Sequence, residues 1–408
     1  MSVKTGDILV GLDIGTSKIC AVIGEVTPQG PNVIGVGCAP SKGIQKGAVT
    51  NIEAAAQSIQ HAIEDAEVVA GCEISSVLVS ITGSHIQGIN SSGVAAVKSS
   101  EVDEDDVVRV LESAKAVAIP PDRQFLHVLA QDYILDGQEG IRNPRGMSGV
   151  RLEAKVHIVT GSVSCAQNLV KCVNRCQLEV SDIVLSSLAA SEGVLTEDER
   201  ELGCAVVDIG SGTTDIAVWS KGALVFTGVL GIGGNHLTSD LAKGLQTSLM
   251  DAERLKVLSG CAMTSAVGVD EVVHIPSTGG REPKISPRRV LSEIIEPRLE
   301  EIFELVNREL EKSGYKDSIP SGLVLTGGTS LMDAVPELAQ RVVGLPTRRG
   351  VPRNFGGLGD EVQNPQYATA IGLLLHAIHR PDVRSFSPKE TKKGSLFGKF
   401  VAWLKQIV

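Results

Sequence analysis

DIGTSK at residues 13–18 and DIGSGTTD at residues 208–215 are two copies of one motif. Each copy joins two apolar runs rich in β-branched residues, at residues 8–13 and 18–24 for the first copy and 205–208 and 215–220 for the second. This order predicts a strand, a glycine turn and a second strand in both places. Because the same unit recurs far along the chain, we expect two related lobes in an α/β fold.

The motif places groups that can bind phosphate at the end of a strand. Its glycine allows a tight turn in which backbone N–H groups face an anion. In the first copy, Thr16 and Ser17 add hydroxyl donors and Lys18 adds a positive charge, while Asp13 can hold Mg²⁺ through water molecules. One Asp-Gly hairpin is usually only a turn. A second copy with the same order, led by Asp208, favours a shared phosphate site.

Two further glycine turns suit a nucleotide between the lobes. Gly327-Gly328-Thr329 follows a predicted strand, so a flat adenosine can approach the backbone and a helix N-terminus adds a favourable dipole. GIGGN at residues 231–235 opens another predicted helix. The chain has no G-x-x-x-x-G-K-[ST] motif and no G-x-G-x-x-G motif after a strand, which argues against P-loop and Rossmann sites.

Composition sets the broad class of the protein. A chain of 408 residues is too long for one ordinary core and predicts two or more domains. Hydrophobic residues make up 42% and charged residues 21%, which indicates globular domains rather than disorder. A net charge of −10 and an aromatic content of 3% argue against nucleic acid as a partner.

The eight cysteines form no C-x-x-C pair, and we interpret them as buried, reduced thiols of a cytosolic protein rather than as a metal site. Residues 1–6 carry no apolar signal segment. No apolar run reaches the ~18 residues that a membrane span needs. His376 and His379, at a predicted helix end, are interpreted as surface or cap residues rather than ligands.

Hydrophobic periodicity and turn residues predict the remaining elements. We expect helices at residues 52–70, 164–176, 183–195, 237–258, 290–312 and 366–379. We expect a charged surface link at residues 196–201 and an exposed, locally basic loop at residues 275–289. Residues 84–160 differ in character, because short strands there surround an acidic-headed helix at residues 100–118. This segment predicts a small inserted α+β domain.

The paired hairpins and the late Gly-Gly turn resemble the actin, Hsp70 and hexokinase ATPase superfamily, and within it the family of the bacterial cell-division protein FtsA. The resemblance covers nearly the whole chain and is carried also by the inserted segment, the terminal helix and residues 82–86, 143–153 and 294–298. It implies a two-lobed actin-like fold with duplicated core domains, one inserted α+β domain and a C-terminal amphipathic helix.

The resemblance also implies domain boundaries. We expect the first lobe at residues 1–83 and 161–200, the inserted domain at 84–160, the second lobe at 201–243 and 305–380, a small partner-binding lobe at 244–304, a linker at 381–394 and a membrane-targeting helix at 395–408.

ATP and Mg²⁺ are the ligands that the resemblance implies. The residues expected at the phosphates are Asp13, Gly15, Thr16, Ser17 and Lys18 on one side and Asp208, Gly210, Gly212, Thr213 and Thr214 on the other. The residues expected around the ribose and base are Gly233, Gly234, Glu253, Lys256, Gly327, Gly328 and Thr329. Asp13 and Asp208 would hold Mg²⁺ through water. Glu253 and Lys256 also fit an ordinary i,i+3 ion pair on an exposed helix.

Turnover is expected to be slow or absent. Relatives that hydrolyse ATP well carry a polar or acidic group near the attacking water, on the segment that enters the helix between the lobes. Here that segment, residues 185–191, is LSSLAAS and has no carboxylate before Glu192. A serine is a poor general base, because it would itself need activation.

The last residues form a predicted amphipathic helix. Its apolar residues recur at intervals of three and four and share one wide face: Leu396, Phe397, Phe400, Val401, Trp403, Leu404, Ile407 and Val408. Lys399 and Lys405 lie away from that face, and Lys389, Lys392 and Lys393 precede it. A basic amphipathic helix on an acidic chain suits an anionic membrane surface. Packing back on the core or into a partner groove is the alternative.

The resemblance implies an adaptor on the cytoplasmic face of the bacterial inner membrane, at the division septum. Its expected partners are the tail peptide of the tubulin-like FtsZ, bound by the small lobe near Arg288 and Arg289, further copies of itself in a filament, and later division proteins at the inserted domain. A solvated basic loop is as good an interpretation of the two arginines. Alternative classes are a sugar kinase, a pilus-type assembly ATPase and an Hsp70-like chaperone. Against the chaperone, no separate β-rich peptide-binding domain is expected after the ATPase part of the chain.

Overall fold

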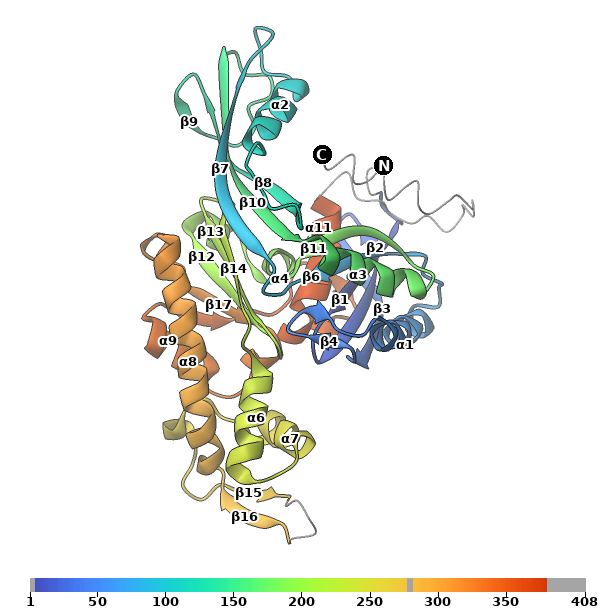
Figure 1. Ribbon diagram of the computed structural model, residues 1–408, viewed down its shortest axis with the longest axis vertical. Coiled ribbons are helices and arrows are strands. Elements are labelled where there is room, and N and C mark those ends of the chain that lie inside the picture. The colour runs from blue at the N-terminus through green and yellow to red at the C-terminus, as the bar shows by residue number, and fades with distance from the viewer. Residues whose placement is uncertain (1–3, 277–281, 380–408) are drawn as a thin grey trace.

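The computed structural model describes residues 4–276 and 282–379, and in Figure 1 these form two lobes with a domain at each end of the long axis. The predicted linker at residues 381–394 and the predicted membrane helix at 395–408 lie outside the described residues. No helix in the described ranges is long and apolar enough to cross a membrane.

Each lobe is built on a mixed sheet. In spatial order the first sheet consists of β11 (Glu179–Leu185), β6 (Ser76–Ile81), β1 (Ile8–Ile14), β2 (Lys18–Thr27), β3 (Gly30–Pro40) and β19 (Gly356–Gly357). The second consists of β14 (Ala223–Leu230), β13 (Thr214–Ser220), β12 (Cys204–Ile209), β17 (Leu323–Thr326) and β18 (Thr347–Arg349).

The two sheets confirm the predicted duplication. In each, the strand before the DIG motif pairs antiparallel with the strand after it and parallel with a strand on its other side. A further parallel strand, β11 or β18, lies beyond that one. The central strands β1 and β12 are almost wholly buried, because both faces of each sheet are covered.

Helices cover both faces of the first sheet. On one face Gly35 and Gly37 of β3 lie against the backbone of Ala66 and Ala62 in α1 (Ile52–Ala70). On the other face Gly11 of β1 lies against Ala370 of α11 (Ala368–His379). The second sheet shares a core with the long α8 (Arg289–Ser313) and with α9 (Val335–Val343).

α4 (Ser186–Val194) and α11 form a close helix pair between the lobes. They approach through small residues, so a methyl group at Gly372 would lie 1.7 Å from the carbonyl oxygen of Ala189. A Cβ at Gly193 would likewise lie 2.5 Å from the carbonyl oxygen of Ala368. Since α4 also contacts β12, β13 and β17, this pair connects the two lobes.

The inserted domain has a core of its own. Its sheet, in spatial order, consists of β7 (Gln87–Ala96), β10 (Arg151–Ser162), β8 (Arg123–Leu135) and β9 (Gln138–Ile141), with α2 (Glu104–Ala114) packed on it. The acidic head of the predicted helix is a capping box in which Asp103 and Asp106 bond each other's backbone N–H. The helix therefore begins at Glu104 rather than at residue 100.

The remaining elements surround these cores. α3 (Val163–Arg175) packs on the first lobe, the hairpin β4 (Ile44–Gln45) and β5 (Ala48–Val49) precedes α1, and α5 (Glu197–Leu202) leads into β12. At the end of the long axis opposite the inserted domain lie α6 (Gly234–Leu245), α7 (Leu249–Ser259), β15 (Val272–Ile275) and β16 (Lys284–Pro287) (Figure 1). Short turns are η1 (Thr264–Ala266), η2 (Lys316–Ser318), η3 (Gly328–Leu331), α10 (Gly359–Val362) and η4 (Pro365–Tyr367).

Several predicted elements differ from the structure. Residues 183–185 are the end of β11 and not helix, because buried Ile183 and Val184 pair with β6. The predicted link at residues 196–201 is helical, since Thr196 and Glu199 form a capping box that starts α5. The helix predicted over 237–258 is two helices, because the chain turns at Gln246 in the left-handed region (φ 56°).

Three further expectations are corrected. Part of the predicted loop at residues 275–289 is the β15–β16 hairpin. His376 is buried rather than at the surface. The end of the range 305–380, assigned to the second lobe, belongs to the first lobe: β19 pairs with β3, and α11 shares the core of the first sheet. After β18 the chain crosses from the second lobe back to the first, and the order of the repeats in the sequence does not predict this crossing.

The α4–α11 contact generates a prediction. Gly372→Ala should lower the free energy of unfolding by about 1–3 kcal/mol, because the added methyl group overpacks a contact with backbone atoms. The matched control is Gly359→Ala, where nothing lies within 4 Å of the added Cβ. Urea denaturation followed by circular dichroism measures both, and equal midpoints for the two variants would refute the expected overpacking.

Candidate functional site

A cavity of about 310 Å³ lies between the lobes. It brings together most of the predicted nucleotide residues: Asp13, Gly15, Thr16, Ser17, Lys18, Asp208, Gly210, Gly212, Thr213, Glu253, Lys256, Gly327, Gly328 and Thr329. Thr214, Gly233 and Gly234 do not line it. Thr214 is fully buried and donates to the carbonyl oxygen of Ile232, so it supports the loop behind the cavity.

The two DIG hairpins face the cavity with the same internal hydrogen bond. The N–H of Gly15 donates to the carbonyl oxygen of Lys18 at 3.0 Å, and the N–H of Gly210 donates to that of Thr213 at 2.9 Å. A Cβ at Gly15 would lie 2.7 Å from the carbonyl oxygen of Lys18, so only glycine fits this turn. The repeated sequence therefore forms a repeated geometry around one space.

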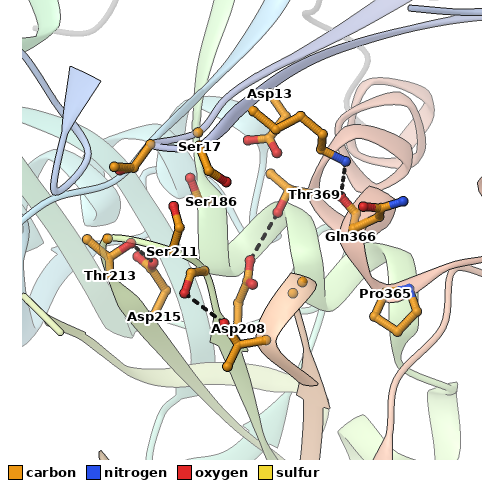
Figure 2. Close-up of a pocket in the computed structure, with 18 of the residues that line it drawn as sticks. Asp13, Ser17, Ser186, Asp208, Ser211, Thr213, Asp215, Pro365, Gln366 and Thr369 are labelled. Atoms are coloured by element: carbon orange, nitrogen blue, oxygen red, sulfur yellow. Dashed lines mark hydrogen bonds between the residues drawn. The ribbon is translucent and has the colours of Figure 1, made fainter. Parts of the chain in front are cut away.

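Three aspartates enter the cavity, as Figure 2 shows for Asp13, Asp208 and Asp215. Asp13 accepts a hydrogen bond from the hydroxyl of Ser80 at 2.8 Å, and Asp208 accepts one from Thr369 of α11 at 3.2 Å. Asp215 accepts from Thr213 at 2.9 Å and from Thr82 of the first lobe. The contacts of Thr369 with Asp208 and of Thr82 with Asp215 thus join groups from different lobes.

Burial and mutual repulsion disfavour charge on these carboxyls. Burial together with the charges of Asp215 and Asp13 raises the pKa of Asp208 to about 8. Burial raises the pKa of Asp215 to about 6, although Thr82 and Thr213 oppose the shift. Burial also raises the pKa of Asp13, against the hydrogen bond from Ser80 and the charge of Lys18. Such a set is suited to a cation that would offset the repulsion.

A hard divalent cation fits this chemistry. Carboxylate oxygens are ligands that Mg²⁺ prefers, and the ion usually keeps several of its waters. Within residues 4–276 and 282–379, no three His, Cys, Asp or Glu side chains are placed to ligate one ion together. The predicted mode, in which Asp13 and Asp208 hold Mg²⁺ through water, is therefore compatible with the geometry.

Two lysines supply positive charge. Lys18 donates from Nζ to the carbonyl oxygen of Gln366 at 3.1 Å and lies 4.1 Å from the centre of the Tyr367 ring. Lys256 is buried and bonds Glu253 at 2.6 Å and the carbonyl oxygen of Gly234 at 3.2 Å. Lys256 is thus held from below the α6 N-terminus, while its partner Glu253 is half-exposed, so the pair is more than an ion pair on an exposed helix surface.

One end of the cavity suits a flat, partly apolar group. Val257, Leu331 and Met332 line it there, beside Gly327 and Gly328. Gly327 has φ 83°, and a Cβ would lie 2.3 Å from Oδ1 of Asp208, so this turn requires glycine. The element that follows is a four-residue 3₁₀ helix and not the predicted α-helix. A favourable helix dipole is therefore available at the N-terminus of α6 and not at this turn.

Sequence reasoning did not name several lining residues as contacts: Asp215, Thr82, Ser211, Gln366 and Thr369. Ser186 lies in the segment 185–191 that was expected near the attacking water. Asp215 stands in the second motif itself, near the start of β13, whose residues are buried up to Trp219. As a strand-end aspartate it gave no signal in the sequence that it is buried. Thr369 gave no signal, because only the return of α11 to the first lobe brings it to Asp208.

The predicted partner-binding arginines differ from each other. Arg288 caps α8 rather than lying in a loop, and it bonds Glu271 and Asp333, each at 2.7 Å, and the carbonyl oxygen of Ser259. Arg289 is 57% exposed and has one i,i+4 partner, Glu293, at 3.3 Å. Only Arg289 presents its guanidinium largely to solvent.

The carboxylate cluster predicts a pH dependence of stability. The folded protein holds a proton on Asp208 that the unfolded chain releases above pH 3.8. The stability that the protonated Asp208 contributes is therefore full below pH 3.8 and is lost as pH rises towards about 8. Asp208→Asn should remove the loss, which is a few kcal/mol at about 1.4 kcal/mol per pKa unit. Thermal unfolding at pH 5 and pH 8 with a chelator measures it.

The matched control for this experiment is Asp65→Asn, at an exposed position of α1. The advantage of Asp208→Asn over the wild-type chain should grow with pH, whereas that of the control should stay constant. An advantage of Asp208→Asn that is the same at both pH values would contradict the burial of a protonated carboxyl.

Solved structures similar to this chain support the fold. The PilM–PilN type IV pilus biogenesis complex matches with a TM-score of 0.64 and 17% identity, over 91% of this chain and 98% of the other. MreB5 of Spiroplasma citri bound to ADP matches with a TM-score of 0.53 and 14% identity, over 90% and 95%. At such identities the likeness shows the actin-like fold alone.

Sequence comparisons identify the family. The family model "Cell division protein FtsA" matches residues 205–372, and "SHS2 domain inserted in FTSA" matches residues 83–160, the predicted insertion. The FtsA proteins of Pseudomonas aeruginosa and Neisseria meningitidis are 51% and 47% identical, over 93% and 97% of this chain and 91% and 97% of their own lengths. The chain therefore belongs to the FtsA family of cell division proteins.

Proposed function

We propose that the chain is an ATP-binding, actin-like adaptor that ties FtsZ filaments to the inner face of the cytoplasmic membrane. It polymerises there and recruits later division proteins to the septal ring through its inserted domain. The cavity between the duplicated hairpins is the observation that carries the nucleotide part of the proposal. Membership of a cell-division family supports the remainder.

The residues that line the cavity suit ATP, with polar groups for the phosphates at one end and apolar groups for the base at the other. The hairpin N–H groups, Ser17 and Lys18 would contact the phosphates, while the apolar end near Leu331 would take the base. Mg²⁺ would supply charge neutralisation at the phosphates, between Asp13 and Asp208. Two MreB5 structures of this fold are bound to ADP and AMPPNP, which supports a nucleotide as the ligand of this chain.

Slow hydrolysis is expected from the polar groups that α4 places at or near the cavity. Ser186 is the group that α4 contributes to the cavity lining, while Glu192, on the same helix, bonds Arg200 at 2.9 Å instead of lining the cavity. Asp215 is a carboxylate that the slow-turnover expectation did not consider. Each of its oxygens accepts one hydrogen bond, from Thr82 and Thr213, which fixes its orientation but leaves it able to take a proton, so Asp215→Asn is the variant that tests it as a base.

Nucleotide titration tests this site. Lys18→Met should weaken Mg²⁺-ATP binding roughly tenfold, the effect of losing one charge-assisted hydrogen bond. The exposed Lys42→Met, in the same lobe, should bind as the wild-type chain does. Phosphate release should stay below about 1 per second, an ordinary rate for enzymes. Faster release that Asp215→Asn abolishes would make the protein an efficient ATPase and refute the expected slow turnover.

Membrane attachment would come from residues 395–408, which lie outside the described residues. Each basic residue near an anionic surface contributes about 1 kcal/mol, so one such helix binds weakly. Polymerisation would place many helices on one surface and raise the avidity. The MamK double helical filament has this fold (TM-score 0.52, 14% identity), so a protein of this fold can form a filament, which supports the proposed polymerisation.

Liposome sedimentation tests the anchor. Deleting residues 395–408 should abolish pelleting with anionic vesicles and leave ATP binding unchanged. Trp403→Glu should act like the deletion, because it puts a charge on the apolar face, whereas Gln406→Glu changes charge on the polar face and should reduce pelleting only slightly. Pelleting of the deleted chain would show that another surface binds the vesicles.

The FtsZ tail would bind the small domain formed by α6, α7, the β15–β16 hairpin and the N-terminal half of α8. Arg289 is the better of the two predicted contacts for an acidic tail, because the donors of Arg288 are used internally. The pilus-type alternative rests on the fold alone, since the PilM–PilN likeness has 17% identity.

A further inference from the structure

Two cysteines face each other across neighbouring strands of the first lobe. Cys20 of β2 and Cys38 of β3 are direct partners in the antiparallel register, and their Sγ atoms are 3.1 Å apart. Cys20 is fully buried, while Cys38 is partly exposed. Both belong to the side of the sheet that faces Tyr367 and α11.

The backbone geometry suits a disulfide at this pair. Directly opposite residues of antiparallel strands have Cα atoms roughly 4.5–5.5 Å apart. Disulfides span Cα separations of about 4.4–6.8 Å. The two sulfurs can therefore bond by side-chain adjustment, without parting or sliding the strands.

The surroundings of Cys38 connect the pair to the nucleotide cavity. Its Sγ lies 3.8 Å from the hydroxyl of Tyr367, whose ring centre is 4.1 Å from Nζ of Lys18. Lys18 itself lines the cavity and donates to the carbonyl oxygen of Gln366. The hydrogen bond with Cys20 and the charge of Lys18 hold the pKa of the Cys38 thiol below its usual range, against the effect of burial. This favours the reactive thiolate.

We propose that Cys20 and Cys38 form a reversible thiol–disulfide pair that responds to peroxide and weakens nucleotide binding through Tyr367 and Lys18. The nucleotide part rests on the proposed ATP site. Most structural disulfides belong to oxidising compartments, whereas cytosolic ones are commonly redox sensors.

The reaction needs hydrogen peroxide as the oxidant. The Cys38 thiolate attacks one peroxide oxygen, the O–O bond breaks and hydroxide leaves, which gives a sulfenic acid. The sulfur of Cys20 then attacks the sulfur of Cys38, the S–O bond breaks, and the departing hydroxide takes the Cys20 proton as water. Two thiols are oxidised and one peroxide is reduced to two waters. A thiol reductant reverses the bond by exchange.

Bond formation must bring the two sulfurs closer together, and we propose that this shifts Cys38 relative to Tyr367. An S–S bond is about 2.05 Å long, compared with 3.1 Å between the two sulfurs here. As Cys38 turns towards Cys20, the Tyr367 hydroxyl loses a partner and the ring under Lys18 is less well held. A misplaced lysine contributes less to phosphate binding, because charge-assisted hydrogen bonds depend on position.

Peptide mapping of the full-length protein tests the bond. After treatment with hydrogen peroxide and alkylation of free thiols, mass spectrometry should find a peptide joining Cys20 to Cys38, and dithiothreitol should remove it. Cys38→Ser and Cys20→Ala should each abolish it, while Cys72→Ser, at another partly exposed cysteine, should not. Circular dichroism of the variants checks that they fold. Absence of the joined peptide in the wild-type chain overturns the proposal.

Nucleotide titration of the same samples tests the coupling. The oxidised wild-type chain should bind Mg²⁺-ATP roughly tenfold more weakly than the reduced chain, and Cys38→Ser should not respond to peroxide. Equal affinities with the disulfide present overturn the coupling through Lys18. If the reduced chain binds no ATP, the proposed function fails instead, while the peptide map still decides the disulfide.

Discussion

The approach of the two lobes depends on the repulsion among the carboxyls buried between them. Asp13, Asp208 and Asp215 come from both lobes into one cavity, and burial already drives the pKa of Asp208 to about 8. Without a counter-ion, the lobes can approach only if protons stay on the carboxyls. A cation with a phosphate chain would replace those protons at neutral pH. The approach of the lobes is thereby linked to whatever occupies the cavity.

The α4–α11 pair lets that constraint act on the whole molecule. Its glycine and alanine contacts bring backbone against backbone, so the helices cannot adjust by side-chain rotation. Thr369, near the start of α11, bonds Asp208 of the second lobe, and the rest of the helix shares the core of the first. A change at the carboxyls is therefore passed to a rigid element rather than absorbed locally.

How much the sequence revealed depended on whether a feature was local. The hairpins at Asp13 and Asp208 and the helix α1 follow from turn chemistry and periodicity, and the structure has them where predicted. The crossing of α11 to the first lobe, and with it the contact of Thr369, depends on tertiary packing that no local pattern encodes. Asp215 was missed because a buried aspartate and a strand-end aspartate look alike in sequence.

The position of α11 also bears on how the proposed nucleotide site and the proposed membrane anchor are connected in one chain. The helix starts beside Asp208 and runs about 18 Å, at 1.5 Å per residue, to His379. There His379 lies 3.6 Å from Glu192, and although burial opposes it, His379 and Arg200 bring the pKa of Glu192 to about 2. The tail that carries the proposed anchor thus leaves the fold from an ion pair on the helix that contacts the nucleotide site. One packed element, α11, consequently runs from the proposed nucleotide site to His379, the last described residue before the proposed anchor.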